Sequence, residues 1–284
     1  MTIEASASRR RSRSGTIVWI VVLAICLAVT VIPIVFMLMT SVKSQSEVFT
    51  NPLLLPQSIQ WDNFIRAWVS ADIPARTVNS AVILVGSVLL STITGAAAGY
   101  VCARITPRWI GAGITGLFAL GLLLPVQSAL VPLFTQMQSL GLLGTVVPII
   151  LVDAALQLPL TVVIFSAFFH VLPEEVEEAA FLDGASRLRV LFSIVIPLSR
   201  PAIATSVILS SVAAWNDYFV ALIFSTDTAI QPLTVGLATF STQHSTDWPA
   251  TLAYCTVIAV PMFLLYVLLQ RYITDGVATG AVRG

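Results

Sequence analysis

Residues 17–39 read IVWIVVLAICLAVTVIPIVFMLM and contain no charged side chain. About 20 apolar residues in a helix cross a bilayer core of about 30 Å, so this run is long enough to span a membrane. Four arginines precede it, Arg9, Arg10, Arg11 and Arg13. The run is longer than the apolar core of a signal peptide, about 7 to 15 residues, and no A-x-A cleavage pattern follows it. We therefore expect an uncleaved first transmembrane helix.

Apolar runs of similar length recur along the chain, at residues 78–101, 110–134, 146–169, 202–224 and 252–269. Hydrophobic residues make up 57% of the 284 residues and charged residues only 10%, against about 25% charged residues in soluble domains. Several prolines fall within the runs, where membrane helices tolerate kinks. The sequence predicts an all-α polytopic membrane protein with six transmembrane helices and no sizeable soluble domain.

The distribution of basic residues predicts the orientation. If the N-terminus is cytoplasmic, eleven Lys or Arg lie in cytoplasmic segments and three, Lys43, Arg66 and Arg76, lie outside. The positive-inside rule then places both termini in the cytoplasm. The formal net charge is zero, which gives no sign of a nucleic-acid partner. The expected order is a basic cytoplasmic tail (1–16), the first helix (17–39), an extracytoplasmic loop (40–75), a core of five helices (76–273) and a cytoplasmic tail (274–284).

The loop 40–75 is the longest segment outside the predicted helices. Its residues Trp61, Phe64, Ile65 and Trp68 are spaced i, i+3, i+4 and i+7, which indicates a short helix with one apolar face. Two interpretations are open, a helix anchored at the membrane interface by its two tryptophans and a docking surface for an external partner.

Residues 171–200, between the fourth and fifth predicted helices, carry a pattern too regular for a passive link. Pro173, Glu174 and Glu175 suit the first turn of a helix, and Asp183-Gly184 suits its end. A second short helix is predicted from the apolar spacing of Leu188, Leu191, Phe192 and Val195, after which Pro197 and Pro201 turn the chain. Such a pair of helices is either a binding surface or a self-packed loop that lies on the inner surface of the membrane.

Glu178-Ala179-Ala180, followed by Gly184 and then by Ile194 and Pro197, closely resembles the EAA signature of ABC-importer permeases. The resemblance is closest to the carbohydrate-uptake branch, the maltose- and glycerol-phosphate-type permeases. It extends to Asn79-Ser80, Tyr100, Arg104, Trp215-Asn216-Asp217 and the terminal Gly280-Ala281-Val282-Arg283-Gly284. Arg283 stands where that branch usually has lysine, which preserves the charge.

The resemblance implies a bacterial plasma-membrane permease subunit without catalytic activity of its own. The sequence agrees, because its only lysine, Lys43, follows Val42 and so lies in no G-x-x-x-x-G-K-[ST] phosphate loop. The implied partners are a homologous second permease, two cytoplasmic subunits that bind ATP and Mg, an extracytoplasmic solute-binding protein, a carbohydrate and membrane lipid. The resemblance assigns contacts with the ATP-binding subunits to Glu177, Glu178, Ala179, Ala180, Asp183, Gly184, Ile194 and Pro197, and to the tail residues Gly280, Ala281, Val282 and Arg283.

Polar residues within the apolar runs are candidates for a substrate path, because an ionised side chain at the bilayer centre costs at least about 2.5 kcal/mol. Asp153 and Asp217 both fall roughly 10 Å below the outer ends of their helices. Amides, carboxylates and aromatic rings suit a sugar, which adds further candidates to these two: Gln127, Gln157, Trp215, Asn216 and Tyr218. The alternative is that these groups only join helices by hydrogen bonds. No metal site and no cofactor of this chain's own are expected.

An ion-coupled secondary transporter that uses Asp153 and Asp217 as a relay is the main alternative function. The absence of an inverted repeat in the sequence and the presence of the EAA pattern disfavour it. The sequence does not identify the carbohydrate.

Overall fold

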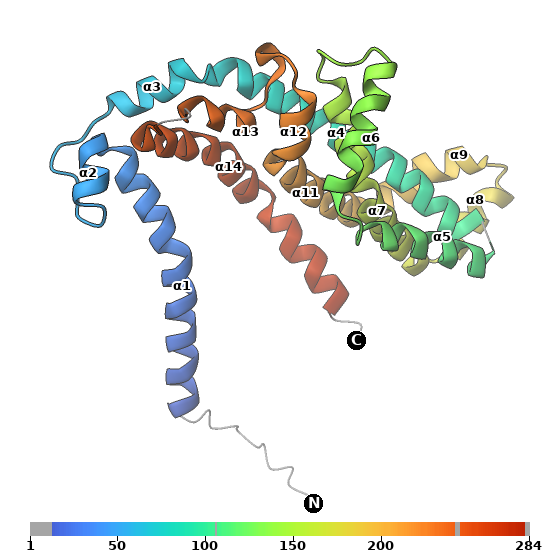
Figure 1. Cartoon of the computed structure of the whole chain (residues 1–284). Coiled ribbons are helices and arrows are strands. Elements are labelled where there is room, and N and C mark those ends of the chain that lie inside the picture. Colours follow the sequence, from blue (N-terminus) through green and yellow to red (C-terminus); the bar gives the residue numbers. More distant parts are fainter. Residues whose placement is uncertain (1–12, 106, 242–244, 282–284) are drawn as a thin grey trace, which may run out of the picture. The chain divides into compact units, whose positions relative to one another are not determined.

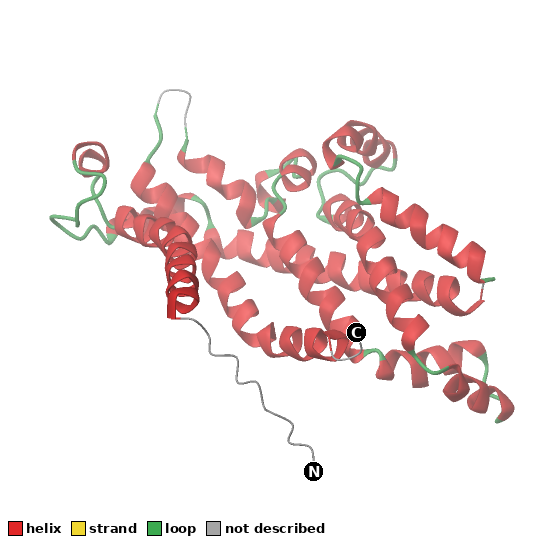
Figure 2. Cartoon of the chain, turned by 90° about the horizontal axis from the view of Figure 1, so that it is seen from below, coloured by secondary structure: helices red, strands yellow, loops and turns green. Residues whose placement is uncertain are grey.

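The computed structural model describes residues 13–105, 107–241 and 245–281. Over these ranges the chain consists of helices and loops, with one isolated bridge between Ser241 and Thr246 (Figure 2). The all-α prediction is confirmed for this part of the chain. The chain divides into two compact units, one of residues 1–67 and 240–256 and the other of residues 68–239 and 257–284. Figure 1 labels the helices of both.

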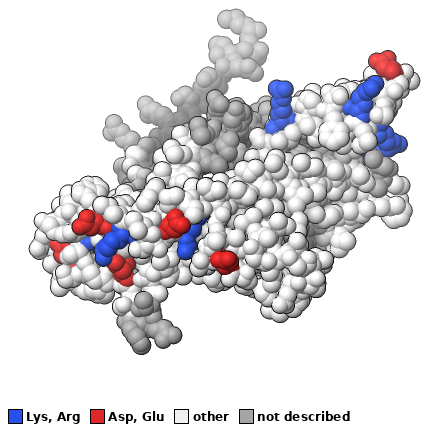
Figure 3. Space-filling model, turned by 90° about the horizontal axis from the view of Figure 1, so that it is seen from above, with Lys and Arg blue, Asp and Glu red and all other residues white. Residues whose placement is uncertain are grey.

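The first unit contains α1 (Arg13–Ser41), which includes the whole first apolar run. The rest of the first unit does not cover this helix, since Ile20, Leu23 and Leu27 are 59%, 65% and 65% exposed. An apolar surface of this size needs lipid or another protein around it. Charged side chains are also sparse on the face of the molecule in Figure 3, as expected for a membrane protein.

Two short helices follow α1, and the sequence analysis missed the first of them. Helix α2 (Gln45–Thr50) begins with a capping box, in which Ser44 and Glu47 each bond the other's backbone N–H. The Ser44-x-x-Glu47 spacing was the signal for it. The Glu47 carboxylate accepts hydrogen bonds from the backbone N–H groups of Ser44 and of Gln57. These bonds, that from Ser44 first, lower the pKa of Glu47.

Helix α3 (Asp62–Ser70) lies where the apolar spacing predicted a helix, but the chain covers its polar side. Asn63 and Ala67 are buried, whereas Trp61, Ile65 and Trp68 remain exposed. The apolar face therefore stays free for lipid or a partner.

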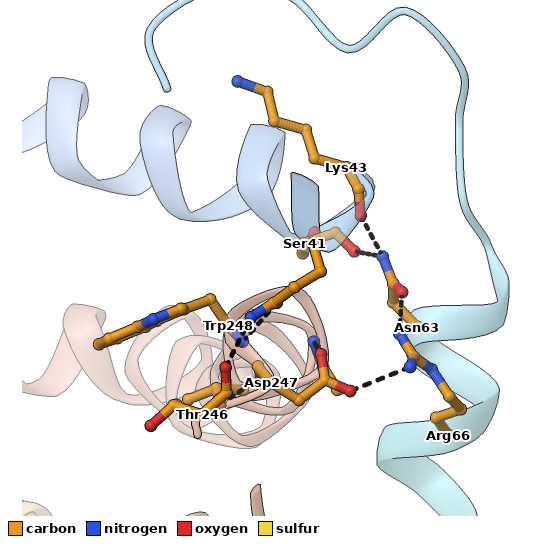
Figure 4. A network of polar contacts seen from close by, with 10 residues as sticks. Ser41, Lys43, Asn63, Arg66, Thr246, Asp247 and Trp248 are labelled. Atoms are coloured by element: carbon orange, nitrogen blue, oxygen red, sulfur yellow. Dashed lines mark hydrogen bonds and ion pairs between the residues drawn. The ribbon is translucent and has the colours of Figure 1, made fainter. Parts of the chain in front are cut away.

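A network of polar contacts ties the first unit together (Figure 4). Asn63 Nδ2 donates to the carbonyl oxygens of Ser41 and Lys43 at 2.8 and 2.9 Å. Arg66 pairs with Asp247 at 3.0 Å. The Lys43 ammonium donates to the carbonyl oxygens of Asn51 and Pro52, and the side chain is 1% exposed. The end of α1, α3 and the segment before α14 are thus joined.

The second unit is built on α4 (Ile73–Tyr100) and α7 (Val147–Val171), which pack closely along their length. Glycines on α4 permit the approach: a Cβ at Gly95 would clash with Thr161, and one at Gly99 would lie 2.7 Å from Phe165 Cβ. Helix α11 (Arg200–Asn216) packs against both.

Two of the predicted spans are broken into separate helices, a larger change than the kinks expected at prolines. The run 110–134 forms α5 (Arg108–Gly121) and α6 (Val126–Ser139), bent by 95°. Pro125 lies at the start of α6, where its missing N–H costs no hydrogen bond. The run 202–224 forms α11 and α12 (Phe219–Phe224), interrupted at Asp217 and Tyr218.

The chain between the long helices forms shorter elements. These are η1 (Val101–Ile105), α8 (Glu174–Leu182), α9 (Arg187–Val190), η2 (Leu191–Val195), α10 (Ile196–Leu198), η3 (Thr228–Ile230), α13 (Leu233–Gly236) and η4 (Leu237–Phe240). Both η1 and η2 are π-helical.

The last helix, α14 (Trp248–Ala281), is longer than the predicted run 252–269. Residues 274–281 continue it, although a tail without structure was expected there. Extending an existing helix requires no new nucleus, so even a glycine-rich segment can follow.

Among the described residues, three helices are long and apolar enough to cross a membrane, Ile17–Ser41, Ile73–Arg104 and Val147–Val171. The number rises to five if each bent helix pair forms one span. The apolar part of α14, Trp248–Leu264, is shorter. Six spans and cytoplasmic termini stay predictions.

Candidate functional site

Helix α8 and the corner after it have the form that the sequence predicts. The helix begins directly after Pro173, with Glu174, Glu175 and Glu177 in its first turn. Gly184 has φ +80°, a left-handed conformation that favours glycine. Its N–H bonds the Phe181 carbonyl and the next N–H, of Ala185, bonds the Ala180 carbonyl, both at 3.0 Å. These two hydrogen bonds form a Schellman motif, which ends the helix at a defined residue.

Glu177 fixes α8 to the end of α4. Its side chain is 8% exposed, and its carboxylate accepts hydrogen bonds of 2.8 Å from Arg104 Nε and from the Tyr100 hydroxyl. The same guanidinium reaches Glu174 at 3.2 Å and donates to the Leu172 carbonyl at 2.7 Å. Tyr100 and Arg104 appeared in the family resemblance without a role, so this role was missed.

The opposite side of α8 is uncovered. Glu178, Ala179 and Asp183 are exposed, and Leu182 is 90% exposed. Two consecutive glutamates therefore point in different directions, Glu177 into the chain and Glu178 away from it. An exposed leucine among carboxylates is a surface suited to another protein.

The second short helix departs from the predicted register. Val190, Leu191 and Val195 are buried, whereas Leu188 and Phe192 are 68% and 64% exposed. The prediction assumed 3.6 residues per turn, but residues 191–195 form a π-turn, in which the Ile196 N–H bonds the Leu191 carbonyl. The wider turn brings different residues onto the buried side.

The chain then turns by 77° at Ser199, between the predicted prolines. Of the two motif residues here, Ile194 is half-buried and Pro197 exposed.

A small cavity in the second unit brings together three of the candidate path residues, Asp153, Trp215 and Asp217. Its volume is about 10 Å³, which is room for about one water molecule. The other lining residues are Ser80, Ile83, Ile149, Ala214, Ala221, Pro232 and Thr234.

Asp153 is 4% exposed, and its Oδ2 has no hydrogen-bond partner among the described residues. Gln157, one turn further along α7, is also buried and its Oε1 is likewise unpartnered there. Buried polar groups without partners are rare in folded proteins, so each needs an explanation such as bound water or a role in function.

Asp217, in contrast, has a structural task. Its carboxylate accepts from the backbone N–H groups of Val220 and Ala221, at 3.4 and 2.8 Å, and so caps α12. Its carbonyl accepts a hydrogen bond from the Thr234 hydroxyl at 2.8 Å. Of the two aspartates, Asp217 therefore fits the alternative in which the polar group only joins helices by hydrogen bonds, and Asp153 does not.

The remaining candidates do not line the cavity. Gln127 and Asn216 are exposed, and the half-buried Tyr218 ring packs against Phe219. In the tail, Gly280 and Ala281 lie in the last turn of α14, while Val282 and Arg283 lie outside the described residues.

The Asn79-Ser80 pair of the family pattern ties α4 to the loop before α13. The Asn79 amide donates to the carbonyl oxygens of Ala229 and Gln231 at 2.8 and 3.1 Å. Ser80 Oγ accepts from the Leu233 N–H at 2.8 Å. Ser80 and Thr234 line the cavity, although the sequence analysis made neither a candidate path residue. For Ser80, the Asn79-Ser80 pair of the family pattern was a signal.

Comparisons with known proteins agree with this architecture. The chain is 34% identical to the diacetylchitobiose uptake system permease protein NgcG of Streptomyces coelicolor, over 98% of this chain and 92% of that protein. It is 33% identical to the melibiose/raffinose/stachyose import permease protein MelC of Bacillus subtilis, over 89% of this chain and 91% of that protein.

Among solved structures, the fold is similar to a chain in the crystal structure of a bacterial ABC transporter involved in the import of the acidic polysaccharide alginate. The TM-score is 0.79 at 24% identity, covering 95% of this chain and 99% of that chain. The family described as binding-protein-dependent transport system inner membrane component matches residues 95–278. This chain therefore belongs to that family and is a multi-pass permease subunit of the inner membrane.

Proposed function

We propose that this chain is one membrane subunit of an ATP-driven, binding-protein-dependent importer of an oligosaccharide or a related carbohydrate. The observation that carries the proposal is α8, an exposed acidic and apolar surface held at a fixed tilt by Glu177 on its other side. Relatives that take up diacetylchitobiose and melibiose support the substrate class.

The proposed topology is that of the sequence analysis, with six spans, both termini cytoplasmic and the loop 171–200 in the cytoplasm. In this topology the bent pair α5–α6 forms one span, α11 with α12 forms another, and α14 is the sixth. In this topology α8 faces the ATP-binding subunits, which would bind ATP and Mg and hydrolyse the nucleotide. The tail residues Gly280 to Arg283 would meet the same subunits.

The remaining partners are a homologous second permease and an extracytoplasmic solute-binding protein. The exposed α1 leaves an apolar surface for the first, because such a surface needs lipid or another protein around it. The exposed side of α3, with Trp61 and Ile65, supports a contact at the outer surface, with the membrane interface or with the binding protein.

The proposed substrate path passes Asp153, Gln157 and Trp215. An unpartnered carboxyl group in the hydrocarbon region is costly, which supports a role beyond packing. A cavity for one water molecule is too small for a sugar, so the path would open by movement of α11 and α12. The ion-coupled alternative has no support, since Asp217 serves as a helix cap.

The test is copurification. The tagged chain, coexpressed with the neighbouring transport subunits, should bring down an ATPase, and Leu182→Glu should reduce that recovery at least about tenfold by placing charge in an apolar contact. Leu182 is exposed, so its replacement leaves folding intact. An ATPase recovered equally well with the variant would show that α8 is not the contact, and an ATPase never recovered with the wild-type chain would refute the proposed function.

A further inference from the structure

We propose that Arg104 is a positioning residue for energy coupling, because it makes α8 and the end of α4 move as one body. This inference rests on the proposed function of α8. Arg104 touches neither substrate nor nucleotide in this proposal. It acts through Glu177, by transmitting a displacement of α8 to the pair of long helices α4 and α7.

The hydrogen bonds of Arg104 are directed at α8 and at Leu172, two residues before its start. Its Nε bonds Glu177, one terminal nitrogen bonds Glu174 and the other bonds the Leu172 carbonyl. The side chain is 7% exposed, so water competes little for these bonds. A guanidinium is planar and forked, and therefore sets the direction of its partners as well as their distance.

Both chain connections of α8 are corners. Leu172, before it, is extended (φ −66°, ψ 136°), and Gly184, after it, is left-handed. Non-helical residues of this kind are the positions where hinge motions are absorbed. The side-chain contacts of Glu177 and Glu174 therefore determine the tilt of α8, and the Leu172 carbonyl bond holds one of the corners.

The other end of the link is rigid. Arg104 lies in η1, which continues α4 directly, and Tyr100 packs edge-on against Phe169 of α7 with ring centroids 5.9 Å apart. The glycine contacts of α4 continue this packing toward the middle of α7. A force on Glu177 therefore reaches α4 and α7 together. A π-turn at this point agrees with the frequent occurrence of such turns at functional sites.

The decisive variant removes the link and leaves no buried charge behind. Tyr100→Phe, Arg104→Met and Glu177→Leu together replace the cluster by apolar groups of similar size, a change that buried ion pairs often tolerate without loss of stability. The matched control is Arg66→Ala with Asp247→Ala, which removes an ion pair of the first unit. Both are measured in the complete transport complex reconstituted in vesicles, with saturating sugar-loaded binding protein.

We expect the triple variant to assemble with its ATPase at the wild-type yield and to keep basal ATP hydrolysis. Sugar uptake per ATP hydrolysed should fall at least about tenfold, whereas the control keeps the wild-type ratio. Uptake per ATP that stays unchanged in an assembled triple variant would overturn the proposal. So would a loss of uptake that only follows a loss of complex yield, since that describes a structural role.

Tyr100→Phe alone supplies a second measurement, because it removes one hydroxyl and keeps the ring that packs against Phe169. It should lower uptake per ATP roughly fivefold, the effect expected for one hydrogen bond. Arg104→Lys should give a similar loss, because an ammonium cannot reach three acceptors in one plane. Wild-type coupling in both single variants would count against the proposal, and a wild-type complex that contains no ATPase would overturn the proposed function as well.

Discussion

Replacement of Gly184 by valine should disconnect ATP hydrolysis from uptake while the protein still inserts and assembles. Gly184 has φ +80°, and apart from its two chain neighbours no heavy atom lies within 4 Å of the position that a Cβ would occupy. Backbone strain is therefore the whole effect, with no contribution from a clash. The corner would leave its left-handed conformation, and α8 would lose the cap formed by the N–H groups of Gly184 and Ala185.

The size of the effect follows from the conformation. A left-handed backbone costs an L-residue roughly 1–2 kcal/mol, with β-branched residues at the upper end. About 2 kcal/mol reduces the population of the native corner by a factor of about 30. Asparagine tolerates this region best and alanine is intermediate, so uptake per ATP should fall in the order Asn, Ala, Val.

The assay is sugar uptake and ATP hydrolysis in vesicles that contain the complete complex. Gly113→Val is the matched control, because Gly113 also has open space around it but lies within α5 and outside the left-handed region. Valine there should be neutral or slightly stabilising. Equal behaviour of the two valine variants, or wild-type coupling in Gly184→Val, would refute the reasoning.

Three further predictions concern packing, the polar cavity and pH. Gly99→Ala should destabilise the protein by about 1–3 kcal/mol in detergent, because its Cβ would press on Phe165, whereas Gly116→Ala, in open space, should not. Asp217→Ala should lower the yield of folded protein through loss of the α12 cap, while Asp153→Ala should lower sugar uptake at unchanged yield. The pKa of Glu47 in the folded protein lies below its ordinary value of 4.5, so the ionised carboxylate should stabilise the fold above pH 4.5 and this stabilisation should be lost as the pH falls through the folded-state pKa. Glu47→Gln should remove this step from the pH profile of thermal unfolding.

The sequence was most informative where local chemistry decides the structure. Asp183-Gly184 predicts the end of α8 because few residues other than glycine adopt φ near +80° at low cost. The apolar run of α1 likewise predicts its helix, since a backbone in lipid must satisfy its own hydrogen bonds.

The bends were harder to predict, because an apolar run has the same hydropathy whether its helix is straight or broken. The break at Asp217 depends on a carboxylate that turns back to cap α12, and the sequence placed that carboxylate without indicating its direction. The register of residues 191–195 depends on a π-turn, for which the 3.6-residue period gives no signal.

The site shows the same division. Helical spacing separates Glu177 and Glu178 by about 100° around the axis, so the two cannot occupy the same narrow face of α8. Arg104, which lies 73 residues before Glu177 in the sequence, determines that Glu177 is the buried one. No local sequence pattern around Glu177 indicates this partner. Contacts of this kind become visible only when the helices are packed.

The burial of Lys43 has a practical consequence for experiments on the assembled transporter. Lys43 is the single lysine of the sequence, and its ammonium donates to two carbonyl oxygens within the first unit. Reagents that modify amines, such as succinimidyl esters and the cross-linkers derived from them, will find little to attack here. In a mixture of subunits, such reagents will label the companions of this chain. Distances to the chain itself are better measured from cysteines introduced at exposed positions away from α8, such as Leu53.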